Sequence, residues 1–219
     1  MTAVDGDRLD AWLARLGGPG FVGFEDRDAA VAEMRAAGAD ALFPLLLPML
    51  AGDAEARCTA CEAILRVDPE RGLKSALPLL DDANAGVRYF ACECLAESGG
   101  QGAVPALLSV LRSHADPNLR CSATWGLGRH GGPGVIPALL AAMASDHETD
   151  DMGHSPSHCA SMALDNLLGT EETRLRFGDF CRMLDREPDL DRLRRLAEER
   201  YRHWKAAAEP GAAADGGGR

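Results

Sequence analysis

Short runs of apolar residues recur through the middle of the chain at a spacing of about thirty residues. A polar turn follows each run, and after it comes a stretch whose apolar positions lie three and four residues apart, the spacing of an amphipathic helix. The runs occupy residues 43–50, 73–80, 104–111 and 135–143. We therefore predict four helical hairpins in which each run forms the first helix.

The turns between the two helices of each hairpin carry side chains that cap helices. A side-chain oxygen at the start of a helix accepts a hydrogen bond from an otherwise unpaired amide of the first turn. Pro48 and Pro78 occupy equivalent positions, two residues before the end of the first helix of their hairpins. We expect each proline to kink its helix. The predicted caps of the second helices are Asp53, Asn84, Asp116 and Ser155.

The hairpins are copies of one unit. The segment Gly99–Leu108 returns 32 residues later as Gly131–Leu140. Arg57, Arg88 and Arg120 occupy one place near the start of their second helices. Because this place adjoins the turn, we expect each arginine to bind turn carbonyls or the aspartate of a neighbouring turn.

This unit resembles the HEAT repeat, and most closely the short HEAT-like repeats of phycobilisome lyases. The resemblance rests on the Val-Pro-Ala-Leu-Leu start at residues 104–108 and covers roughly residues 40–168. The other residues that carry it are Asp82, Asn84, Val87, Arg88, Ala91 and Leu95. It implies an all-α fold, a short right-handed α–α superhelix with first helices on the convex side and second helices on the concave side. It does not imply one function.

The two ends of the chain depart from the repeat, as capping units of a solenoid must. We expect capping helices in residues 1–39, four hairpins in 40–168, further capping helices in 169–208 and a disordered tail in 209–219. The first helix has an apolar stripe at Leu9, Trp12, Leu13 and Leu16. The last has one at Leu190, Leu193, Ala197, Tyr201 and Trp204.

Composition narrows the classes of partner. The 219 residues carry a net charge of −11, which disfavours binding to nucleic acid or to an anionic membrane. No apolar run approaches the length of a membrane-spanning helix. The cysteine count of seven is odd, and acidic residues occupy the first positions, where a secretion signal needs an apolar run. We therefore expect a cytoplasmic protein with free thiols.

One face of the second helices is a candidate partner-binding surface. Positions one and five after the repeat arginine lie on the same side of a helix. We expect the stacked repeats to present them as an acidic stripe with two aromatic anchors, for a protein partner of basic or mixed charge. The alternative is a solvated face with Trp125 partly packed on the next repeat. The candidate residues are Glu62, Tyr89, Glu93, Glu97, Trp125 and Arg129.

The fourth hairpin contains an insertion between Met143 and Cys159 that is rich in histidine and acidic residues. Imidazole and carboxylate are ligands for divalent metals, so a metal site is one interpretation. A loop that contacts a partner and a solvated acidic loop are the others. The Ser155-Pro156 helix start separates two of the histidines. The candidate ligands are His147, Asp150, His154 and His158.

No motif assigns a catalytic residue or a cofactor. Cys58-x-x-Cys61 falls inside a predicted helix without a second zinc-binding pair, so we interpret it as buried packing. The sequence favours a non-catalytic scaffold or adaptor that binds a protein on the acidic concave face. The alternative is a lyase-type or metal-assisted enzyme subunit that holds a chromophore or an acceptor protein.

Overall fold

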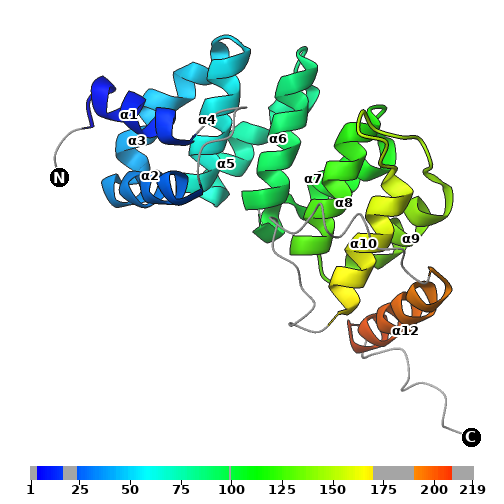
Figure 1. Cartoon of the computed structure of the whole chain (residues 1–219). Coiled ribbons are helices and arrows are strands. Elements are labelled where there is room, and N and C mark those ends of the chain that lie inside the picture. Colours follow the sequence, from blue (N-terminus) through cyan, green and yellow to red (C-terminus); the bar gives the residue numbers. More distant parts are fainter. Residues whose placement is uncertain (1–3, 17–23, 99, 170–189, 209–219) are drawn as a thin grey trace, which may run out of the picture. The chain divides into compact units, whose positions relative to one another are not determined.

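The computed structural model describes residues 4–16, 24–98, 100–169 and 190–208. Within these ranges every regular element is a helix, which confirms the expected all-α class (Figure 1). In the first half of the chain the elements are α1 (Gly6–Leu16), α2 (Phe24–Ala37), α3 (Ala39–Leu46), η1 (Leu47–Ala51), α4 (Ala54–Val67), α5 (Pro69–Ala76), η2 (Leu77–Asp81) and α6 (Ala85–Ser98). They continue as α7 (Gly100–Ser113), α8 (Pro117–His130), η3 (Pro133–Val135), α9 (Ile136–Ser145), α10 (Pro156–Leu168) and α12 (Leu190–Ala208).

The chain divides into two compact units, Met1–Leu107 and Leu108–Arg219, with the boundary inside α7. The expected boundaries of the repeat region, after residues 39 and 168, lie near the ends of α2 and α10. Residues 170–189 of the expected C-terminal capping helices and the tail expected at 209–219 lie outside the described residues.

The N-terminal helices pack onto the first hairpin. Leu9, Trp12, Leu13 and Leu16 are all buried, which confirms the apolar stripe predicted for α1. They share a hydrophobic core with residues of α2, α3 and α4. The Trp12 Nε1 donates to Glu33 Oε2 of α2 at 2.8 Å, and this hydrogen bond holds the pKa of Glu33 below its usual value.

The first helices of the first two hairpins break where proline was expected to kink them. After Leu46 and after Ala76 the α-helix gives way to a 3-10 turn, η1 or η2, with Pro48 or Pro78 at its start. Proline has no amide hydrogen for the α-helical hydrogen-bond ladder and crowds the preceding turn.

The predicted caps of the second helices are confirmed. Asp53 accepts a hydrogen bond from the Ala56 amide and Asp116 from the Asn118 amide, both at 2.9 Å. Asn84 and Ser155 accept from Val87 and His158 at 3.2 Å. The starts of α4, α6, α8 and α10 are therefore encoded locally.

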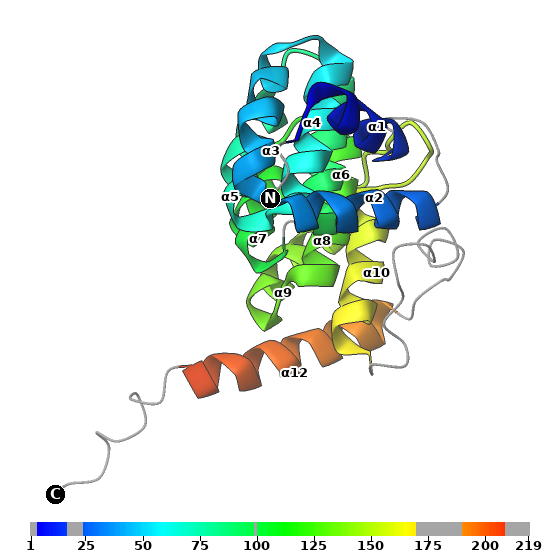
Figure 2. The same ribbon diagram turned by 90° about the vertical axis from the view of Figure 1, so that its left-hand side faces the viewer.

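In the second unit, α8 and α10 pack so closely that the backbone of α10 leaves no room for a side chain at Gly128 of α8. A Cβ atom built on Gly128 would lie 2.9 Å from the Ala163 Cα atom. The Asn166 Nδ2 of α10 donates to the Gly128 carbonyl at 2.9 Å, near the end of α8. The last helix, α12, lies across the end of the hairpin formed by α9 and α10 (Figure 2).

A search of the described part of the chain finds no single helix long and apolar enough to cross a membrane. Two consecutive helical segments, Asp26–Ala37 and Ala39–Ala51, would together be long and apolar enough to span a membrane, but the chain bends by 108° between them.

Candidate partner-binding face

The repeat arginines fix the turns from which the second helices project. Arg57 Nη1 donates to the Gly52 carbonyl at 2.7 Å, and its Nη2 and Nε bind both Asp82 carboxylate oxygens of the next turn. Arg88 Nη1 donates to the Asp82 carbonyl at 2.8 Å. The hydrogen bond from Arg57 holds the pKa of Asp82 below its usual value. Both expected kinds of contact are therefore found.

Arg120 makes the same contacts in the second unit. It is buried, and its Nη1 donates at 2.8 Å to the carbonyls of His114 and Ala115. Its Nε and Nη2 bind the Asp146 carboxylate, and Nη2 also donates to Glu148 at 2.8 Å. The carboxylates of Asp146, which has the largest effect, and Glu148 raise the pKa of Arg120. The arginine thereby ties the start of α8 to the inserted loop.

The acidic stripe expected in the first unit is largely neutralised from within. Glu62 is only 4% exposed, and Arg66 Nε donates to it at 2.9 Å. Arg66 Nη2 also donates to Glu97 at 2.6 Å, and Arg27 of α2 lies 3.5 Å from Glu97. The expectation of open acidic contacts at Glu62 and Glu97 is therefore corrected, because Arg66 of α4 binds both acids and Arg27 of α2 also lies beside Glu97.

Burial and ion pairing act in opposite directions on the pKa values of Glu62 and Arg66. Desolvation raises the pKa of Glu62, since its charged form loses water that Arg66 replaces only in part. Burial by itself would lower the pKa of Arg66, but Glu97 and Glu62 outweigh it and raise that pKa. Arg66 lies four residues after Glu62, a helical spacing that sequence reasoning could have used. Arg27 gave no such signal.

Tyr89 and Glu93 of α6 are the accessible members of the face in the first unit. The Tyr89 side chain is 39% exposed and Glu93 is half-buried. Tyr89 follows Arg88, whose contacts with the turn fix the start of α6. An aromatic side chain on a fixed helix suits contact with a partner.

In the second unit, one of the two expected face residues is buried and the other is exposed. Trp125 is 4% exposed, which corrects its expected role as an open anchor. Its burial follows from the packing of α8, in which ten successive residues from Leu119 to Gly128 are buried. Arg129, one turn further along, is exposed.

Hydrogen bonds from backbone amides to the Asp150 side chain organise the histidine-rich insertion. Asp150 accepts hydrogen bonds from the amides of Met152 at 2.9 Å and His154 at 2.7 Å. The His154 Nδ1 lies 3.5 Å from the other Asp150 carboxylate oxygen. His147 is exposed, and His158 is half-buried in the first turn of α10. Within the ranges that the structure describes, no group of three or more His, Cys, Asp and Glu is placed to hold a metal ion.

The described cysteines are free and buried. Burial raises the pKa of the Cys58 thiol to about 11 and also raises that of Cys92. Hydrogen bonding between thiols raises the pKa of Cys94, beside Cys61, and of Cys121, beside Cys159. The thiols whose pKa is raised, those of Cys58, Cys92, Cys94 and Cys121, therefore have little thiolate character at neutral pH.

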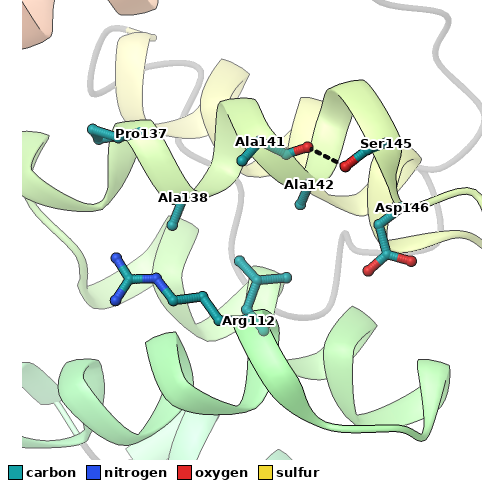
Figure 3. A pocket seen from close by; sticks show the side chains of 8 residues that line it. Arg112, Pro137, Ala138, Ala141, Ala142, Ser145 and Asp146 are labelled. Atoms are coloured by element: carbon teal, nitrogen blue, oxygen red, sulfur yellow. Dashed lines mark hydrogen bonds between the residues drawn. The ribbon is translucent and has the colours of Figure 1, made fainter.

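A hollow of about 460 Å³ lies between α7 and α9, on the side of the first helices (Figure 3). Ala138, Ala141 and Ala142 form much of its lining, and Ser145 donates its hydroxyl to the Ala141 carbonyl at 3.0 Å. Its acid, Asp146, is bound by Arg120. The lining therefore contains no acid–base pair ready for chemistry.

Comparison with known proteins places the repeats in a family. Residues 39–113 and 73–151 match the HEAT repeats, and together these matches cover more than half of the 219 residues. A phycobilisome maturation protein of Synechococcus elongatus is 37% identical over 99 residues, which are 45% of this chain and 47% of that relative. The match thus spans about half the length of the relative. The chain belongs to the HEAT-repeat family.

Proposed function

We propose that this chain is a non-catalytic scaffold that binds a protein partner through the second helices of its HEAT repeats. The observation that carries the proposal is the exposed Tyr89 on α6, beside Glu93 and directly after a turn that Arg57 and Arg88 fix. A side chain held on a rigid helix loses little conformational entropy when a partner binds. Arg129 of α8 is the exposed candidate in the second unit.

The state of the acids and thiols supports binding rather than chemistry. Glu62 and Glu97 are engaged by arginines, so neither is a free general acid or base. The raised pKa of the Cys58 thiol makes it a weak nucleophile at neutral pH. Free thiols at the described cysteines also support a reducing, cytoplasmic setting.

The partner that we propose is a protein of basic or mixed charge. A net charge of −11 attracts such a partner and accelerates encounter at low salt. The name of the phycobilisome maturation relative adds one feature, a partner that is itself being matured or assembled. The scaffold would then hold that protein in place during a step performed on it.

The experiment begins with affinity purification of the chain from its native cell and identification of the bound protein by mass spectrometry. The purified partner is then titrated against Tyr89→Ala and against Leu47→Ala. Leu47 is the matched control, because it is 43% exposed in the same unit but belongs to a first helix, whereas Tyr89 is 39% exposed. We expect Tyr89→Ala to weaken binding about tenfold, as loss of an aromatic anchor does.

Two results would overturn the proposal. One is equal binding by wild type and Tyr89→Ala. The other is a photo-crosslinking residue that captures the partner from position 47 as well as it does from position 89. Arg129→Glu then tests whether the contact extends to the second unit.

The alternative is an enzyme subunit that holds a chromophore or an acceptor protein. The name of the phycobilisome maturation relative is the observation that favours it. Purified chain that carries a visible chromophore, or a metal in stoichiometric amount, would favour this alternative over the scaffold.

A further inference from the structure

Most residues of the last helix, α12, are exposed, and among the described residues of the second unit only α9, α10 and η3 make extensive contact with it. Of its 19 residues only Leu193 and Ala197 are buried. Three large apolar side chains of the helix remain open, with Leu190 50%, Leu196 41% and Trp204 41% exposed. By contrast, α4 buries seven of its 14 residues. The apolar surface of α12 therefore extends beyond Leu193 and Ala197, the two residues that are buried against the protein.

The exposed Trp204 side chain is held in place by its neighbours. The Trp204 ring lies against Gly134 of η3, where a Cβ atom would come within 3.3 Å of its Cη2. Tyr201 packs beside it, with ring centroids 5.7 Å apart. Figure 2 shows α12 running across the ends of α9 and α10, which support its buried strip. An ordered aromatic edge gives a partner a contact without a large entropic cost.

A hollow of about 510 Å³ lies along one side of α12, where the helix meets the end of α10. Leu168, Leu196 and Trp204 give it apolar walls. Its polar residues are Glu199, Arg200 and His203, and the His203 Nε2 lies 3.8 Å from the Glu199 carboxylate. Its volume falls in the range of protein pockets that take apolar groups.

The charge of α12 is opposite to that of the rest of the chain. Residues 1–170 contain 12 basic and 23 acidic side chains. The helix has three acids, Asp191, Glu198 and Glu199, against six bases, which leaves it an excess of three positive charges. The bases are Arg192, Arg194, Arg195, Arg200, Arg202 and Lys205. All nine charged side chains are exposed.

We propose that α12 is a second protein-docking surface, which binds an acidic amphipathic segment of a partner protein. Apolar side chains of that segment fill the hollow beside Leu196 and Trp204, and its carboxylates face Arg200 and the positive field of the helix. This surface lies on α12 of the second unit and Tyr89 lies on α6 of the first, so the inference does not depend on the proposed function.

Two other occupants fit the observations less well. A second copy that paired α12 with α12 would set the two positive helices against each other, which costs binding energy. The orientation of α12 argues against an anionic membrane, whose charge the helix would attract as it attracts carboxylates. The centre of the apolar stripe, Leu193 and Ala197, faces the protein, whereas a helix that lies on a membrane turns this centre outward.

The test uses the full chain and a fluorescein-labelled synthetic helical peptide with a leucine stripe and glutamate on its other faces. The control peptide has the same leucines and lysine in place of glutamate. We expect the glutamate peptide to bind, measured by fluorescence anisotropy, and to weaken as salt rises. Leu196→Ser and Arg200→Glu should each weaken it by about tenfold or more.

Lys205→Glu is the matched control, because it reverses a charge on the same helix outside the hollow. We expect it to change the affinity less than about threefold, since an exposed charge beside an interface contributes little. The sites are exposed, so circular dichroism should show that all three variants keep the wild-type fold.

Several outcomes would overturn the inference. They include no binding of the glutamate peptide, equal binding of the lysine peptide, and equal weakening by Lys205→Glu and Arg200→Glu. A dimer that light scattering detects and Leu196→Ser dissociates would show that a second copy covers the face. Sedimentation with phosphatidylglycerol vesicles that the same substitution abolishes would show a membrane surface.

Discussion

The close approach of α8 to α10 makes Gly128 the most informative position for a stability measurement. In a solvent-exposed helix, Gly→Ala stabilises by about 1 kcal/mol because alanine restricts the unfolded chain. At Gly128 the new methyl group would lie 2.9 Å from both the Cα and the Cβ of Ala163. Backbone on the opposing helix cannot rotate away, so we take the overpacking cost at the upper end of its range, about 3 kcal/mol. The expected net loss is about 2 kcal/mol.

Thermal unfolding followed by circular dichroism measures this loss, with an expected drop in Tm of about 4–8 °C for a chain of this size. Gly102→Ala is the control, because its nearest neighbour is the flexible end of Leu73, at 3.0 Å. We expect it to leave Tm unchanged or to raise it. Adding Ala163→Gly to Gly128→Ala should cost at least about 1 kcal/mol less than the two single changes together. A Tm that rises with Gly128→Ala would refute the close packing of α8 on α10.

Three further predictions concern the charged contacts. Arg120→Lys should destabilise by about 2–3 kcal/mol in urea unfolding, since lysine cannot bind two turn carbonyls and two carboxylates at once. Arg66→Met should cost about 3–5 kcal/mol at neutral pH, because Glu62 is left buried and charged. That cost should shrink on acidification, since burial raises the pKa of Glu62 and a protonated carboxyl needs no cation. Trp12→Phe should raise the pKa of Glu33 toward its ordinary value, as measured by NMR titration of the carboxyl carbon.

Arg112→Lys, at an exposed position, should change stability by less than about 0.5 kcal/mol. An equal effect at Arg120 would contradict the role of the repeat arginine. A loss in Arg66→Met that does not vary with pH would contradict the buried charge at Glu62. Because the folded-state pKa of Glu33 is depressed, its stabilisation is present above the unfolded pKa and is lost as pH falls through the folded one.

Local sequence signals predicted the elements well. The caps at Asp53 and Asp116 act on amides two or three residues away, and Pro48 breaks a hydrogen-bond ladder in its own helix. Such signals need no knowledge of the tertiary structure. The repeat arginines were also foreseen, because a neighbouring copy of a repeat unit supplies the same turn each time.

The candidate face was predicted less well, for a physical reason. Helical spacing groups Tyr89 with Glu93 and Trp125 with Arg129, but it does not say what covers each residue. Burial of Trp125 follows from how α8 packs in its unit, and that packing depends on elements far along the chain.

The sequence by itself determined the helices, their caps, the repeat unit and the residues that fix its turns, because each depends on contacts within a helix or between equivalent positions of adjacent repeats. Only the tertiary structure decided which charges and apolar groups remain accessible. Arg27 neutralises Glu97 from 70 positions away. Within the described part of the chain, α9, α10 and η3 contact α12 along one strip only, and Leu196 and Trp204 remain exposed beside it. Accessibility depends on how distant segments pack together, and no local pattern of residues specifies that packing.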